Sequence, residues 1–118
     1  MSYSISQMAE KFDLKPHTLR FYESQGLIFP GKTKGGVRRY SEQDAERLSL
    51  LCCLKDTGMS LKDIKQFFDL CDRGEETTAQ RLEIFQRHRE HILSEIVELQ
   101  RHLQKIEKKI LVYEDRCK

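Results

Sequence analysis

The chain has 118 residues, of which 38% are hydrophobic and 34% charged, and its 21 Lys/Arg and 19 Asp/Glu give a net charge of +2. This length allows one domain with or without a small extension, and this composition excludes a disordered chain. No run approaches the roughly 18 apolar residues of a membrane span, and the N-terminus lacks the apolar core of a signal peptide. We therefore expect a cytoplasmic protein with no membrane partner and with reduced cysteines.

Two short helices are predicted before residue 26. The first spans residues 4–12. The second begins at Pro16, a residue that fits the first turn of a helix, and ends near Ser24, with Gly26 as its cap. Leu19 and the pair Phe21-Tyr22 are expected to form its apolar face. Two short helices joined by a tight turn are typical of a helix-turn-helix.

Residues 27–40 are predicted to form a two-stranded wing. Pro30-Gly31 and Gly35-Gly36 are turn signals that flank charged residues. The wider stretch 15–40 holds six Lys/Arg and the single acid Glu23, a charge of +5, which leaves −3 on the other residues. A phosphate backbone is the natural partner for such a local basic site.

Two further helices are predicted from their caps. Ser41-x-x-Asp44 resembles a capping box and opens a helix that runs to about Thr57, with Gly58 past its end. Ser60-x-x-Asp63 repeats the pattern and opens a helix that runs from Leu61 to about Cys71. The sequence predicts two regions. Residues 1–76 would form a DNA-binding domain with connector helices, and residues 77–118 a dimerisation helix.

The last segment contains no Gly or Pro and carries a heptad seam, with apolar residues in steps of four and three. About 35 residues at 1.5 Å each would give a helix of roughly 50 Å, too long to bury its seam on so small a domain. We therefore predict a homodimer through this helix. The residues assigned to dimerisation are Ile92, Ile96, Leu99, Leu103, Ile106 and Ile110.

The second helix is expected to lie in the major groove of DNA, with His17 and Thr18 near the base edges. The remaining candidate DNA contacts are expected to bind phosphates, which fixes register rather than reads sequence. They are Arg20, Tyr22, Lys32, Lys34, Arg38, Arg39 and Tyr40. The alternative is a solvated basic surface with both tyrosines packed, but the order of the elements favours DNA binding.

Four segments carry a resemblance to the MerR family of bacterial transcription regulators: residues 5–9, 18–23, 26–28 and 36–40. The resemblance implies a mainly α fold, a winged helix-turn-helix dimer joined by an antiparallel coiled coil. It also implies an operator inside a promoter whose spacer is too long for RNA polymerase, and activation by bending and untwisting that DNA. It implies backbone contacts from Arg20, Tyr22, Arg38 and Tyr40, and a base or groove contact from His17.

The segment 53–61 resembles the electrophile-responsive subgroup of that family, which implies that Cys53 is a sensor thiol for aldehydes or similar compounds. Adding an adduct to a packed helix would force its neighbours to shift. The alternatives are that Cys53 is a buried small hydrophobe, or that the signal is a metal or a small drug. We expect no cofactor and no metal site, because the cysteines are too few and too scattered for one.

The sequence disfavours two other classes of protein. An enzyme is not expected, because the sequence has no phosphate-cradling glycine loop and no recognisable pair of nucleophile and base. A plain coiled-coil adaptor would explain the heptads but not the basic stretch at 15–40.

Overall fold

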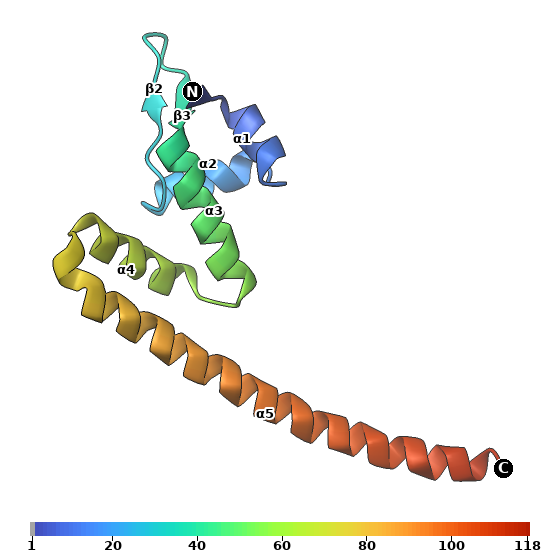
Figure 1. Cartoon of the computed structure of the whole chain (residues 1–118). Coiled ribbons are helices and arrows are strands. Elements are labelled where there is room, and N and C mark those ends of the chain that lie inside the picture. The colour runs from blue at the N-terminus through green and yellow to red at the C-terminus, as the bar shows by residue number, and fades with distance from the viewer. Residues whose placement is uncertain (1) are drawn as a thin grey trace. The chain divides into compact units, whose positions relative to one another are not determined.

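The computed structural model describes residues 2–118, which divide after Glu75 into two compact units that we describe separately. The elements of the first unit are β1 (Ser2–Tyr3), α1 (Ile5–Lys11), α2 (Pro16–Ser24), β2 (Gly31–Lys32), β3 (Arg38–Ser41), α3 (Glu42–Asp56) and α4 (Leu61–Asp72) (Figure 1). The short 3-10 helix η1 (Glu75–Thr77) leads into α5 (Thr78–Arg116).

The predicted helix starts are confirmed by their caps. Ser41 accepts a hydrogen bond from the backbone N–H of Asp44, whose side chain accepts one from the N–H of Ser41, which completes the capping box. Ser4 and Gln7 make the same reciprocal pair at the start of α1. These bonds satisfy N–H groups that the first turn of a helix leaves without partners.

The end of α2 is fixed by Gly26, as predicted. Its φ of 73° lies in the left-handed region, where glycine carries no side-chain penalty. The N–H of Gly26 donates to the carbonyl of Glu23 and the N–H of Leu27 donates to that of Tyr22, both at 3.0 Å. This is a Schellman motif, so the chain leaves α2 in one defined direction.

The wing belongs to a three-stranded antiparallel sheet of order β1-β3-β2. Strand β1 was not predicted: two residues give no periodic signal, and Tyr3 finds its partner Tyr40 far along the chain. Pro30-Gly31 forms no turn, which corrects the sequence analysis, because Gly31 already pairs with Arg39. The hairpin closes instead around Thr33–Gly36, where the N–H of Gly36 donates to the carbonyl of Thr33 at 2.9 Å.

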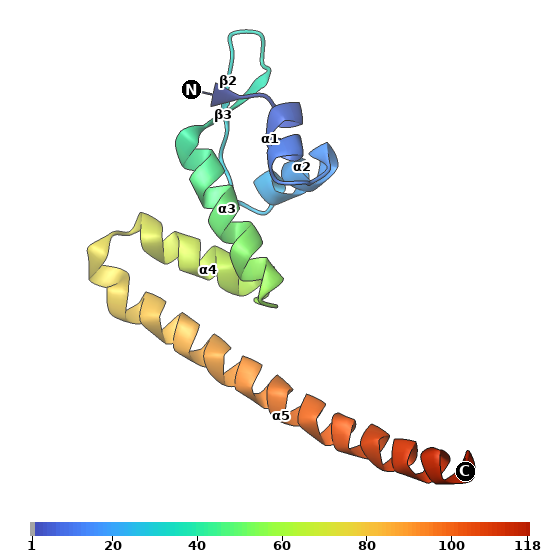
Figure 2. The same ribbon diagram turned by 45° about the vertical axis from the view of Figure 1, so that its right-hand side comes forward.

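The core of the first unit joins α1, α2, the sheet, α3 and α4, and Figure 2 shows α1 close to α2 and β1 beside β3. Leu19 and Tyr22 of α2 face this core, since residues three apart share one side of a helix. Phe21, expected on the same face, is 48% exposed. It follows Leu19 by two positions, and so it points to the other side of α2.

The second unit is dominated by α5, one continuous helix of 39 residues. At 1.5 Å per residue its length is about 58 Å. Among residues 2–118, no helix combines the length and apolar character that a membrane crossing requires.

Candidate nucleic-acid interface

The solvent-facing side of α2 carries polar and basic groups. His17, Arg20 and Ser24 are exposed and follow one another by three and four positions, so they share one face of the helix. Phe21 lies beside Arg20 on this face, and Thr18 is half-buried at its margin. Phe21 was not predicted as a surface residue, although its spacing of two positions from Leu19 is a sequence signal for the opposite face.

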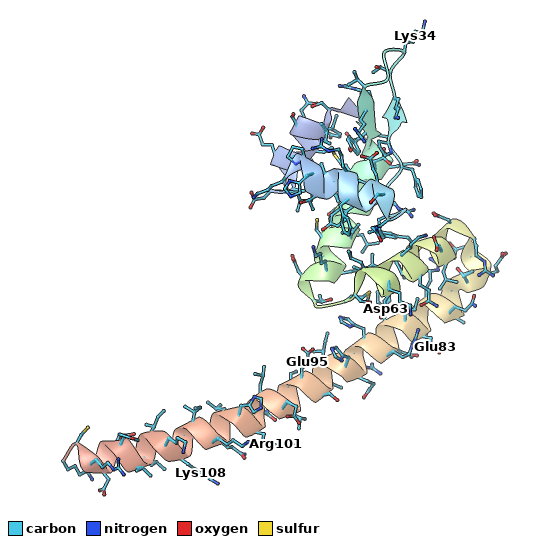
Figure 3. The ribbon with its side chains drawn as sticks, turned by 180° about the vertical axis from the view of Figure 1, so that it is seen from behind. Lys34, Asp63, Glu83, Glu95, Arg101 and Lys108 are labelled. Carbon is cyan, nitrogen blue, oxygen red and sulfur yellow. The ribbon has the colours of Figure 1, made fainter. Side chains whose placement is uncertain are left out.

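The wing adds two exposed lysines to this unit. Lys32 lies in β2, and Lys34 lies at the tip of the hairpin (Figure 3). Their long side chains extend from the hairpin of β2 and β3. The wing therefore presents positive charge well away from the core.

Glu23, the single acid of the basic stretch, joins α2 to the wing. Its carboxylate accepts a hydrogen bond from Arg38 Nε at 2.7 Å and another from the Tyr40 hydroxyl at 3.0 Å. The Glu23 side chain is 17% exposed and that of Arg38 is 35% exposed. Arg38 and Tyr40 alternate along β3 and so point to the same face of the sheet, where Glu23 meets both. No role was predicted for Glu23 from the sequence.

Tyr22 and Tyr40 lie in the core, at 1% and 0% exposure, and not at the surface as their assignment to phosphates requires. The Tyr22 hydroxyl accepts a hydrogen bond from Lys55 Nζ at 3.0 Å, and that of Tyr40 donates to Glu23. Burial and this carboxylate raise the pKa of Tyr40 far above its usual value. Both tyrosine rings therefore hold α2 and β3 in place from within the core.

Two further cations are held by neighbouring elements. Arg39 donates from Nη2 to the Ser2 hydroxyl at 2.8 Å, and so ties β3 to β1. Lys55, at the end of α3, lies over the Tyr22 ring and donates to its hydroxyl, and this hydrogen bond raises the pKa of Lys55. Lys55 connects α3 with α2, a contact between residues 33 apart that no local pattern could predict.

The thiols of α3 differ in environment. Cys53 is exposed, whereas the sequence analysis considered it packed against neighbouring helices or buried. Cys52 is half-buried, and burial raises its pKa, with Asp56 acting in the same direction and Lys55 opposing. Cys71 is half-buried and Cys117 is exposed, and all four cysteines are free thiols.

The predicted seam of α5 lies open on the single chain. Five of its six residues, Ile96, Leu99, Leu103, Ile106 and Ile110, are between 45% and 66% exposed, and Ile92 is half-buried. The charged side chains of Glu95, Arg101 and Lys108 project from the same helix (Figure 3). An apolar row of this length is more surface than a soluble helix leaves in water.

Two histidines of α5, His88 and His91, contact each other, and His91 also contacts an acid. The His88 and His91 rings stack at 6.2 Å between centroids, and His91 Nε2 lies 2.7 Å from Glu95 Oε1. Within residues 2–118 the structure contains no cluster of three or more His, Cys, Asp or Glu side chains arranged to hold a metal ion.

A helix-turn-helix with an exposed polar face, a basic wing and a long helix with an apolar row together define a winged helix-turn-helix DNA-binding protein. Residues 3–71 match the family described as MerR HTH family regulatory protein, and residues 45–109 match the one described as MerR, DNA binding. The chain belongs to the MerR family.

Individual relatives agree with this assignment. An uncharacterized HTH-type transcriptional regulator of Haemophilus influenzae is 41% identical over 115 residues, which cover 97% of this chain and 85% of the relative. The structure of HiNmlR, a MerR family regulator lacking the sensor domain, was solved bound to promoter DNA. It is 40% identical, with a TM-score of 0.78, over 98% of this chain and 92% of that one.

A MerR family regulator from Bacillus thuringiensis is 34% identical, with a TM-score of 0.74, over 93% of this chain and 97% of that one. The chain is therefore a MerR-family transcription regulator that binds DNA.

Proposed function

We propose that the protein is a dimeric transcription activator that binds an operator within a promoter and distorts the DNA between the two promoter elements. The observation that carries this proposal is the likeness of nearly the whole chain to HiNmlR, which was solved on promoter DNA. RNA polymerase bound at the same promoter is the functional partner. The protein activates transcription by deforming the DNA, and the free energy of this deformation depends on the sequence that is bent and untwisted. Such a regulator acts in the cytoplasm, where the promoter lies.

The proposed DNA surface combines α2 with the wing. His17 and Thr18, at the start of α2, reach toward base edges, and Arg20 on the same exposed face binds a phosphate. Lys32 and Lys34 bind phosphates from the wing, together with the outer parts of the Arg38 and Arg39 side chains. Tyr22 and Tyr40 act from within the core by holding α2 and β3 in place.

Dimerisation is proposed through the apolar row of α5. Two copies of this helix, aligned antiparallel, would remove both rows from water at about 25 cal/mol per Å² of apolar surface. A dimer presents two copies of α2 to the two halves of a near-palindromic operator. One chain alone would contact only half of such a site.

The proposed signal is a reactive electrophile such as an aldehyde, received by Cys53. A thiol adds to the carbonyl carbon, so that a C–S bond forms and the thiol proton passes to the carbonyl oxygen. The exposure of Cys53 supports this step, because a small electrophile reaches the sulfur without prior opening of the fold. Cys53 lies on α3 two positions before Lys55, which contacts Tyr22 of α2. Residues two positions apart point to different sides of a helix, so an adduct on Cys53 would act on α2 through a shift of α3 and not by touching Lys55.

Run-off transcription with formaldehyde or methylglyoxal tests the signal. We expect induction by the unsubstituted protein, loss of induction for Cys53→Ala, and near-normal operator binding by that variant, since Ala is well tolerated in a helix. Cys52→Ala is the matched control on the neighbouring position of α3, and Cys71→Ala and Cys117→Ala complete the set. Mass spectrometry of the activated protein locates the adduct.

Full induction of the Cys53→Ala protein, or an unmodified Cys53 in an activated sample, would refute the thiol sensor. A metal ion or a small drug would then be the signal to test in the same assay. DNA binding and dimerisation are measured separately, so this part of the proposal can fail while the assignment as a promoter-binding regulator stands.

A further inference from the structure

Arg47 is a largely buried arginine in the second turn of α3, with 19% of its side chain exposed. Buried arginines are rare unless their charge is paired, so the contacts of this guanidinium are informative. They join three segments of the first unit: the residues that follow α2, α3 itself, and α4. The proposed function gives this residue no role.

The first contact fixes the exit of α2. Arg47 Nε donates to the carbonyl oxygen of Leu27 at 2.7 Å. Leu27 is the residue whose N–H closes the Schellman cap of α2 on Tyr22, one position after Gly26. A charge-assisted bond to this peptide therefore holds the end of the recognition helix against α3.

The second contact reaches α4. Arg47 Nη1 donates to both carboxylate oxygens of Asp72, the last residue of α4, at 3.0 and 3.3 Å. The guanidinium also stacks on Phe68 of α4, 4.3 Å from the ring centroid, and lies 5.6 Å from that of Phe29. One rigid, planar group thus touches α4 on one side and the cap of α2 on the other.

The third Arg47 nitrogen, Nη2, is buried and has no hydrogen-bond partner within residues 2–118. A buried N–H without a hydrogen-bond partner is unfavourable. The other contacts of the guanidinium therefore hold it in a position that does not satisfy all of its own N–H groups. A lysine could reproduce neither the hydrogen bonds that the guanidinium makes in two directions nor its stacking on Phe68, because an ammonium is a single compact charge.

We propose that Arg47 is the positioning residue that couples α4 to the recognition helix α2. The chain passes from α4 through Glu75–Thr77 into α5, so a rearrangement of the dimerisation helix reaches the DNA-binding unit through α4. A shift of Asp72 and Phe68 moves the guanidinium, and the guanidinium moves the peptide that ends α2. The role of α2 in this inference rests on the proposed function.

Two aspartates of α4 form a matched pair for the test. Asp72 and Asp69 have side chains of equal exposure, 55%, and each pairs with a cation. Asp72 reaches Arg47 on α3, whereas Asp69 pairs with Lys65 on its own helix. Asp72→Asn and Asp69→Asn therefore make the same chemical change on the same helix, and only the first weakens a link between elements.

The structure also supplies an internal reference. The cap of α3 closes with the same two bonds as that of α2: Gly58 N–H donates to Lys55 and Met59 N–H to Leu54. It lies at the opposite end of α3 from Arg47. Amide hydrogen exchange measured by NMR compares Gly26 and Leu27 with Gly58 and Met59 in the full-length chain.

We expect Asp72→Asn to speed exchange of Gly26 and Leu27 about five-fold, because an ion pair is replaced by a weaker hydrogen bond from the still charged Arg47 to a neutral amide, and to leave Gly58 and Met59 unchanged. Arg47→Lys should have the larger effect at the same two amides, and Asp69→Asn none. Equal loosening of both caps would make Arg47 a general stabiliser and overturn the coupling, as would an unchanged Gly26 and Leu27.

The same proteins are then titrated by fluorescence anisotropy against a promoter fragment recovered by selection with the unsubstituted chain. We expect weaker binding for Asp72→Asn than for Asp69→Asn. A loosened α2 cap with unaltered affinity would overturn the part of the inference that concerns DNA. If the unsubstituted protein recovered no promoter DNA, the proposed function would fail, and the exchange data would still decide whether α4 and α2 are coupled.

Discussion

Glu23 is the single acid among the basic residues of the stretch 15–40, but its effect is not only to lower the positive charge there. Its carboxylate takes the Arg38 Nε–H and the Tyr40 hydroxyl, so its charge is used to fasten the wing to α2. The basic groups around it therefore differ: Arg20 is exposed, whereas Arg38 already has an acidic partner. A phosphate that binds Arg38 competes with this carboxylate, and one that binds Arg20 does not.

This difference predicts the salt dependence of DNA binding. Arg20→Ala should reduce the slope of log K against log salt by about one unit, because one fewer phosphate is neutralised. Arg38→Ala should reduce it by less, because the charge of Arg38 is already paired with Glu23 and neutralises less phosphate charge. Anisotropy titrations between 50 and 200 mM salt measure the slopes. Arg73→Ala, which removes an equal charge at the cap of α4, is the control.

An altered base preference for Arg20→Ala with an intact salt slope would contradict its assignment to a phosphate. His17→Ala is expected to behave in the opposite way, with a change of sequence preference and little change of slope.

At the scale of elements, helix ends were predicted well because their signals are local. Ser41 with Asp44, Ser60 with Asp63, and the glycines after α2 and α3 all act within a few residues. The wing was predicted less well. Its pairing depends on β3 lying between β1 and β2, and β1 comes from the opposite end of the unit's sequence. Partner choice in a sheet is a property of the assembled unit.

The two helix-ending glycines allow a test of what the cap of α2 contributes. Gly26 and Gly58 have φ values of 73° and 87°, so an alanine at either position is strained by about 1 kcal/mol. A Cβ at Gly26 would also lie 3.2 Å from Lys65 Cε, whereas a Cβ at Gly58 would meet no neighbouring atom. Both variants should lower the free energy of unfolding in urea, Gly26→Ala by slightly more.

Only Gly26→Ala is expected to weaken DNA binding as well, because only it disturbs the exit of α2. If Gly58→Ala weakened DNA binding to the same extent under conditions where both proteins are folded, the cap of α2 would have no special part in recognition.

At the scale of the whole molecule, α5 carries an apolar row that one chain leaves in water. The predicted dimer follows from this row and from the heptad spacing of its residues. Leu99→Asp combined with Leu103→Asp should give monomers, because each carboxylate would be buried without a partner in the seam. Analytical ultracentrifugation measures the assembly state.

The control is Ser94→Asp combined with Gln104→Asp, which adds the same charges at exposed positions outside the seam and should leave the dimer intact. A doubly substituted Leu99/Leu103 protein that still sediments as a dimer would rule out this helix as the interface. Monomers from both proteins would point to general charge repulsion instead.

The sequence by itself determined the helices, their caps, the basic stretch and the heptad row, because each depends on residues within a turn or two of one another. It did not determine what the side chains of the basic stretch do. Tertiary structure alone decided that Tyr22 and Tyr40 are buried, that Glu23 binds Arg38, and that Arg47 joins Leu27 to Asp72. These contacts join residues 15 to 25 positions apart, and they form only when the packing of the core brings those residues together.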